Sequence, residues 1–183
     1  MKIIPLHHIP MKAEYRSPFS AGYIVEGGAL LFFSGCGPIP IYHKHPHDPI
    51  AETQWLAGDI REQTLRTFEN IAEILKAAKG DFRHVLKLNI YLTDMAGQNM
   101  FNEISGRYFD ALNPPARTLV RVPELSHPKM LIEVDGVAAV PRSIEIARSL
   151  DTEAGGHSAR IKVSRVRKRS SGKQSTRRSA HQG

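Results

Sequence analysis

The sequence predicts an α+β domain in which a single sheet carries two helices on one face. Short apolar runs and period-two alternation indicate five strands, and two stretches with apolar residues three or four positions apart indicate helices. The predicted order is β-β-α-β-α-β-β. Two helices cannot readily cover both faces of such a sheet. We therefore expect the other, partly apolar face to be covered in an oligomer.

The first two strands are predicted on either side of a glycine turn. Residues 22–25 form a short strand, residues 26–28 the turn, and residues 29–33 an apolar run that is typical of a buried strand. This run ends in a loop at residues 34–38. Residues 38–58 contain Pro, His and Gly with little periodicity, which indicates a long loop.

The first helix is predicted to begin at Asp59, which together with Glu62 resembles a capping box. Apolar side chains then recur at helical spacing as far as Ala78, and Gly80 is the expected residue beyond the C-terminal cap. A second helix is predicted from about Gly97 to Asn113, where two prolines follow.

The remaining strands have clear alternation. Residues 86–92 are predicted to form a strand with one apolar face, and residues 117–122 and 130–140 form the last two strands. In the final strand, Glu133 and Asp135 lie on one side. This places two carboxylates on an otherwise apolar strand.

The formal charge of +7 does not belong to the predicted domain. Residues 151–183 hold nine of the 25 Lys and Arg residues and two of the 18 acidic residues, so residues 1–150 carry 16 of each sign. We expect one domain at 1–147 and a basic tail at 148–183 with a composition typical of disorder. The neutral domain does not indicate nucleic-acid binding, whereas the tail is expected to bind polyanions weakly and without specificity.

Nothing in the sequence indicates export or a membrane partner. The first eight residues lack the apolar core of a signal peptide, and no stretch approaches the ~20 apolar residues of a membrane helix. Cys36 is the only cysteine, which fits a reducing compartment. We expect a cytoplasmic protein.

Arg117 is the first candidate site residue. It follows the stiff Pro114-Pro115 turn and opens a predicted strand, so its guanidinium is held at the mouth of that strand. A guanidinium presents a fork of donors that suits a carboxylate. Arg117 is therefore a candidate anchor for an acidic substrate, and the alternative is a purely structural ion pair.

The carboxylates of Glu133 and Asp135 are the second candidates. Flanked by Leu, Ile and Val, they need a partner. In a cleft, a carboxylate can orient or deprotonate a water molecule. The alternative is a salt bridge to Arg117 or Arg121 across strands.

Ser34 and Gly35 end the buried strand, where a hydroxyl and a backbone N–H can meet an anionic ligand. Cys36 lies between two glycines and could be accessible, but nothing nearby lowers its pKa, so we do not expect a nucleophile.

Three histidines alternate in the segment His43-Lys44-His45-Pro46-His47. Alternate histidines on an extended loop can bind a transition metal. No further Cys, His or Asp stands at a usual zinc spacing, however. The sequence therefore favours a solvated loop that binds nickel or zinc only incidentally, and we expect neither a functional metal nor a cofactor.

Taken together, short blocks in a fixed order give the sequence a family resemblance. It is similar to the RidA/YjgF family of imine deaminases, also called L-PSP endoribonucleases, over about residues 15–142. The matching blocks are Ser34-Gly35, Asp59, Gln63-Thr64, Asn70-Ile71, Leu75, Ala78, Val85, Lys87, Tyr91-Leu92-Thr93-Asp94-Met95, Phe101-Asn102, Tyr108-Phe109, Pro115-Ala116-Arg117-Thr118 and Ile132-Glu133-Val134.

The resemblance implies a chorismate-mutase-like fold and a homotrimer whose sheets form a central barrel, with sites in clefts between subunits. It implies hydrolysis of a 2-imino acid to a 2-oxo acid and ammonium without a cofactor. Arg117 matches the arginine that holds the substrate carboxylate, and Glu133 the glutamate that places water. Ser34, Gly35 and Asn102 match pocket positions.

Three positions depart from the family pattern. Leu119 stands where many active deaminases have cysteine, Phe19 where they have a pocket tyrosine, and Cys36 where glutamine is common. These departures indicate a divergent branch. A non-catalytic module that binds small carboxylates therefore remains an alternative, and an endoribonuclease is a second one.

Overall fold

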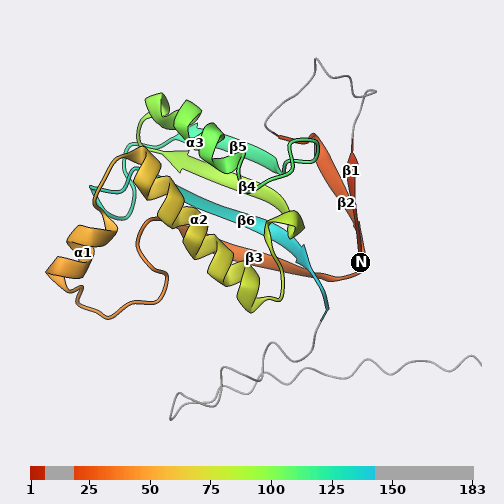
Figure 1. The fold of residues 1–183 in the computed structure, drawn as a ribbon, viewed down its shortest axis with the longest axis horizontal. Helices are drawn as coiled ribbons and strands as arrows, with labels where there is room; N and C mark the ends of the chain where they lie inside the picture. The colour runs from red at the N-terminus through yellow and green to blue at the C-terminus, as the bar shows by residue number, and fades with distance from the viewer. Residues whose placement is uncertain (7–18, 143–183) are drawn as a thin grey trace, which may run out of the picture. The chain divides into compact units, whose positions relative to one another are not determined.

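A mixed four-stranded sheet forms the body of the molecule (Figure 1). The computed structural model describes residues 1–6 and 19–142. The strands lie in the order β3-β6-β4-β5, in which β4 and β5 are parallel and the other neighbouring pairs are antiparallel. Helices α2 and α3 both lie across one face of this sheet. The bounds are β3 Ala29–Cys36, α2 Ile60–Ala77, β4 Val85–Leu92, α3 Gln98–Ser105, β5 Ala116–Arg121 and β6 Ile132–Val140.

The hydrophobic core lies between the sheet and these two helices. Leu88 and Ile90 of β4 and Val134 of β6 are fully buried, and they belong to one cluster with Phe68 of α2 and Phe101 of α3. The predicted apolar face of residues 86–92 is therefore confirmed. Because side chains alternate along a strand, the odd-numbered residues of β6 from 133 to 137 lie on the face away from the helices.

Helix α2 begins where the sequence predicts. The Asp59 carboxylate caps its N-terminus, and Glu62 accepts a hydrogen bond from the Asp59 N–H at 2.9 Å. Gly80 was predicted to be the residue just beyond the C-terminal cap of this helix, and that prediction was wrong. Lys79 adopts the left-handed conformation, with φ of 56°, whereas a Cβ at Gly80 would meet Val140 at 2.9 Å. The glycine is required for close packing and not for its backbone freedom.

The single-sheet prediction was wrong for the N-terminal part of the chain. Strand β2 (Gly22–Glu26) pairs with β1 (Lys2–Leu6), which was not predicted, in a separate two-stranded antiparallel sheet. The turn residues Gly27 and Gly28 have φ of 76° and 83°. This conformation, which glycine adopts readily, separates the β1–β2 ladder from β3.

The segment 38–58, predicted as a loop, contains helix α1 (Pro49–Trp55). Asp48 accepts hydrogen bonds from the N–H groups of Ile50 and Ala51, and Pro49 occupies the first turn. This Asp-Pro start signal was present in the sequence and was missed. Two short 3-10 helices, η2 (Phe82–His84) and η3 (Met95–Gly97), precede β4 and α3.

Helix α3 is shorter than predicted. It ends at Ser105, and residues 106–115 form turns and irregular chain. Tyr108, expected on the helix, nevertheless packs against the core, with its ring stacked on Phe68 at 4.6 Å between centroids.

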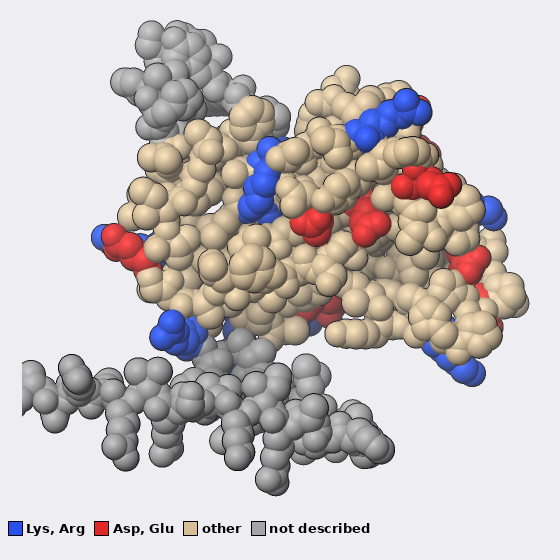
Figure 2. All heavy atoms as spheres, turned by 180° about the vertical axis from the view of Figure 1, so that it is seen from behind, with Lys and Arg blue, Asp and Glu red and all other residues tan. Residues whose placement is uncertain are grey.

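The face of the sheet away from the helices carries exposed apolar side chains. Leu30 is 56% exposed, Phe32 74% and Val120 41%. Figure 2, which views the molecule from behind Figure 1, shows a mostly uncharged surface with acidic side chains near its middle. The expected partly apolar open face is therefore present.

The predicted domain end at 147 and the basic tail at 148–183 lie outside the described residues. Among the residues that the structure describes, no helix has the length and apolar character to span a bilayer.

Candidate active site

Arg117 lies beneath helix α3. The parallel register pairs Arg117 of β5 with Leu88 of β4, which places the guanidinium on the helix-covered face of the sheet. Its Nη1 donates to Asn102 Oδ1 at 3.2 Å and to Ser105 Oγ at 3.3 Å. The guanidinium carbon lies 5.7 Å from the centre of the Phe101 ring, within cation–π range.

The Arg117 charge has no counter-ion within the described part of the chain. Its Nε is buried without a hydrogen-bond partner there, and its known partners are neutral. Burial lowers the pKa of the guanidinium to about 10, so it stays protonated at neutral pH. A buried charge without a counter-ion is unfavourable. The structural ion pair that was the alternative interpretation of Arg117 is absent in these residues, and the arrangement suits an anionic ligand.

Glu133 lies against the end of β3. A Cβ on Gly35 would overlap the Glu133 carboxylate, so the glycine makes room for it. In the described residues Glu133 has no hydrogen-bond or ion-pair partner. Burial raises the pKa of its carboxyl above the ordinary value, and the charge of Asp135 raises it further. A half-buried carboxylate without a partner is suited to accept a proton from water.

Asp135 has a different environment. Its carboxylate accepts hydrogen bonds from Asn89 Nδ2 at 2.7 Å and from the Tyr91 hydroxyl at 3.0 Å. Both donors lie on the neighbouring strand β4. The partners make Asp135 a fixed neighbouring charge, and they leave Glu133 as the candidate for proton transfer.

Cys36 is fully buried, which corrects the expectation that it could be accessible. Burial raises the pKa of its thiol to about 12, and the charges of Glu133 and Asp135 contribute. A thiol with this pKa is protonated at neutral pH. The expectation that it is not a nucleophile agrees with this environment.

The candidate residues fall into two groups on opposite faces of the sheet. Arg117 and Asn102 lie on the helix-covered face, whereas Glu133 and Gly35 lie at the open face. One chain therefore does not bring Arg117 and Glu133 to the same ligand. The group around Arg117 is suited to bind a carboxylate, and the group around Glu133 is suited to accept a proton from water. The sequence predicted both roles.

Ser34 and Phe19 join neither group through a described side-chain contact. Ser34 is exposed in a register irregularity of β3 between Phe33 and Cys36, not in the loop that was predicted. Phe19 is 50% exposed. It precedes Ser20, which hydrogen bonds Tyr23.

The Tyr23 hydroxyl, in turn, lies 2.8 Å from the carbonyl oxygens of both Asn113 and Pro114. This contact holds the Phe19 segment near the turn that leads into Arg117, without bringing the two side chains into a described contact.

A pocket of about 370 Å³ adjoins Glu133. Gly35 and Glu133 line it together with His43, His45 and His47. One nitrogen of each of these three histidines lies within 4.8 Å of the others, a grouping that could hold a metal ion. The fold has thus brought together side chains whose spacing did not match a usual zinc motif.

Sequence reasoning missed several residues of the two groups. Ser105 and Phe101 contact Arg117, and both lie within one helical turn of Asn102. The i,i+3 spacing of Asn102 and Ser105 could have indicated from the sequence that both side chains lie on one face of the helix. The contact between Asp135 and Tyr91 required knowledge of the strand order.

Comparison with known proteins agrees with the family resemblance of the sequence. A model of the family described as Endoribonuclease L-PSP matches residues 11–140. Protein DfrA of Myxococcus xanthus is 36% identical over 121 residues, which are 66% of this chain and 84% of that protein. The human 2-iminobutanoate/2-iminopropanoate deaminase is 40% identical over 86 residues, which are 46% of this chain and 61% of that enzyme.

Solved structures support the fold. A protein of unknown function from Yersinia pestis, YyfB of the Rid family, has a TM-score of 0.63 at 20% identity and covers 76% of this chain and 100% of its own. At that identity the likeness concerns the fold alone. Because the family model matches well over half of the residues, the chain belongs to the Endoribonuclease L-PSP family, also known as the RidA/YjgF family.

Proposed function

We propose that this protein hydrolyses reactive 2-imino and 2-enamino acids to 2-oxo acids and ammonium. The observation that carries this proposal is the buried, protonated Arg117, which has no counter-ion among the described residues. A small substrate with a carboxylate next to its C=N group would supply that counter-ion. The similarity to a human enzyme named for two 2-imino acids supports the same substrate class.

In the proposed reaction, Arg117 binds the substrate carboxylate, and Asn102 and Ser105 hold the guanidinium in place. Glu133 takes a proton from a water molecule whose oxygen attacks the imine carbon. That proton then moves to the nitrogen of the tetrahedral intermediate, and the C–N bond breaks as the C=O bond of the 2-oxo acid forms. Glu133 takes the remaining hydroxyl proton and passes it to the released ammonia, which leaves as ammonium. A protonated imine is already electrophilic, so positioning of water and substrate supplies most of the catalysis.

The proposed site lies between two copies of the chain, with Arg117 from one and Glu133 from the other. Support comes from the opposite faces on which these residues lie and from the exposed Leu30 and Phe32 on the open face. We propose a homotrimer, as the family resemblance implies, with the open faces turned inward. Closed symmetry would give each trimer three equivalent clefts.

Leu119 lies on β5 two residues from Arg117 and packs against the core. Its apolar side chain stands where many family deaminases have cysteine. Substrate binding by Arg117 does not depend on that thiol. If turnover does depend on it, the protein would bind small carboxylates without hydrolysing imines.

A coupled assay tests the proposal. An amino-acid oxidase generates a panel of imines, and the release of 2-oxo acid is followed with and without the protein. Arg117→Ala should lower kcat/KM by about 10- to 100-fold, the loss expected for a charge-assisted carboxylate contact. Arg121→Ala, an exposed arginine on the same strand, is the matched control and should retain activity. Equal activity of the two variants would refute the role of Arg117.

A further inference from the structure

We propose that His43, His45 and His47 form a binding site for a divalent transition metal of the zinc type. The three side chains belong to the segment between β3 and α1, and they are not part of the proposed imine chemistry. Imidazole nitrogen is a preferred ligand of zinc, nickel and copper. The observation that carries the proposal is the way in which two of the rings are held.

The hydrogen bonds of His43 and His47 fix which nitrogen carries the proton. His43 Nδ1 lies 2.6 Å from the carbonyl oxygen of Pro40, which can only accept, so this nitrogen must donate. His47 Nδ1 lies 2.5 Å from Glu52 Oε2 and donates to the carboxylate. A neutral ring whose Nδ1 carries the proton has a lone pair and no proton at Nε2.

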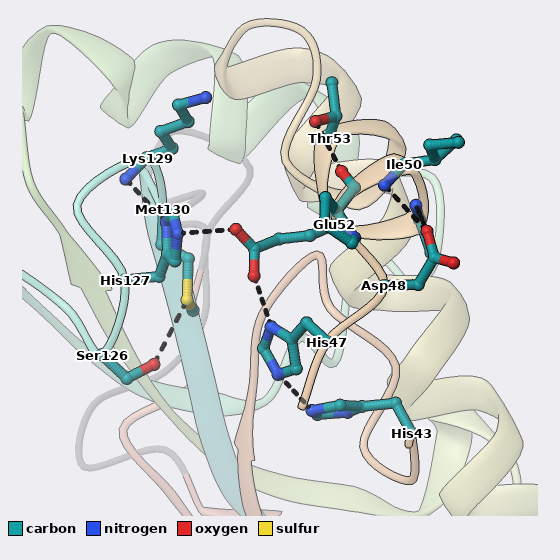
Figure 3. Close-up of polar contacts among 12 residues, drawn as sticks. His43, His47, Asp48, Ile50, Glu52, Thr53, Ser126, His127, Lys129 and Met130 are labelled. Carbon is teal, nitrogen blue, oxygen red and sulfur yellow. Dashed lines mark hydrogen bonds and ion pairs between the residues drawn. The ribbon is translucent and has the colours of Figure 1, made fainter. Parts of the chain in front are cut away.

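These two Nε2 atoms face each other at 2.8 Å (Figure 3). Two nitrogens without protons cannot form a hydrogen bond, so this contact is satisfied by a proton or a metal ion shared between the two lone pairs. A zinc ion with Zn–N bonds of about 2.0–2.1 Å would separate its ligand nitrogens by about 3.4 Å in a tetrahedral site. A small opening of the rings would provide that geometry, and His45 would supply a third nitrogen.

Glu52 serves as the second-layer carboxylate of this site. Its Oε2 holds His47, and its Oε1 lies 3.3 Å from Nε2 of His127 (Figure 3). His127 Nδ1 accepts the N–H of Lys129, so its Nε2 carries the proton and donates to Glu52. A carboxylate that orients a metal-binding histidine in this way is typical of protein metal sites.

Three histidines leave one position of a tetrahedral ion free. The pocket of about 370 Å³ that these histidines line is open to a water molecule or another small oxygen donor at that position. A site with three protein ligands and one exchangeable ligand differs from a closed structural zinc site. Trp55 lies against His43 and His47, with ring centres 5.5 and 5.9 Å away, and limits how far the rings can move.

The test is a calorimetric titration of the metal-free full-length chain, without an affinity tag, with Zn²⁺ and separately with Ni²⁺. We expect one ion per chain at the site. His43→Ala and His47→Ala should each weaken binding at least tenfold. His84→Gln is the matched control and should bind metal as the wild type does. His84 lies on η2, away from the three histidines in sequence, and pairs with Asp81.

Glu52→Gln separates a built site from incidental binding, because it keeps all three histidines and nearly the same shape. We expect affinity to fall about 10- to 100-fold, the usual effect of losing such a partner. The visible absorption of bound Co²⁺ should change with it. Wild-type affinity in His43→Ala and His47→Ala, or in Glu52→Gln, would overturn the proposal. These measurements do not depend on imine hydrolysis.

Discussion

Arg117 and Glu133 lie on opposite faces of one sheet. Arg117 shares the helix-covered face with Leu88, whereas Glu133 shares the other face with Tyr91, its cross-strand neighbour. No side-chain rotation brings them together, because a layer of backbone separates them. If both act on one substrate, they must come from different copies of the chain.

The Asp135 charge should set the acid side of the activity profile. A general base must be ionised, so activity falls as pH drops through the Glu133 pKa, which burial and Asp135 raise above its usual value. In Asp135→Asn we expect the Glu133 pKa to fall and the acid limb of kcat/KM to move to lower pH. The check is a pH–rate profile of both proteins.

The other titratable groups near Glu133 do not account for the expected shift of the acid limb. Cys36 and Tyr91 both have raised pKa values and are neutral over the acid range. The histidines of the adjoining pocket stay the same in both proteins. An acid limb at the same pH in Asp135→Asn would exclude Glu133 as the base.

The exposed apolar side chains of the open face should hold the oligomer together. We expect light scattering of the full chain to give about three times the chain mass. Phe32→Asp should give a monomer, because a charge would be buried at the interface. Ile50→Asp is the control: Ile50 is 72% exposed, similar to Phe32 at 74%, but lies on α1. A trimeric Phe32→Asp would place the interface elsewhere.

The basic tail should be dispensable for catalysis. Residues 151–183 carry the whole excess of positive charge, so they should contact phosphates through screened electrostatics. Deleting them should leave imine hydrolysis unchanged and remove weak, salt-sensitive RNA binding in a filter or fluorescence assay. RNA binding that survives the deletion, or that resists physiological salt, would favour a ribonuclease site on the domain.

Local patterns in the sequence predicted much of the sheet and the two helices that cover it, although α3 ends earlier than predicted. Period-two alternation identified the faces of β4 and β6, and the Asp59–Glu62 pair identified the start of α2. The separate β1–β2 sheet could not be predicted in this way, because it depends on the direction of the chain after Gly27 and Gly28 and not on apolar pattern.

Prediction of the site from the sequence succeeded for single residues and stopped at their arrangement. Arg117 and Glu133 were identified by residue type, but their opposite faces follow from the strand order β3-β6-β4-β5, which no local pattern encodes. The grouping of His43, His45 and His47 depends on how an irregular segment curves. A rule based on spacing along a helix or zinc motif does not apply there.

The most direct test of the shared imine site is complementation between two impaired chains. Arg117→Ala and Glu133→Gln are each produced alone and then co-expressed so that they assemble together. In a cyclic trimer mixed at random, about a quarter of the clefts would combine an intact Arg117 with an intact Glu133. We predict that each variant alone retains at most about a tenth of the wild-type activity in imine hydrolysis and that the mixture regains about a quarter of it. A mixed assembly that stays at the level of the single variants would contradict a site built from two chains.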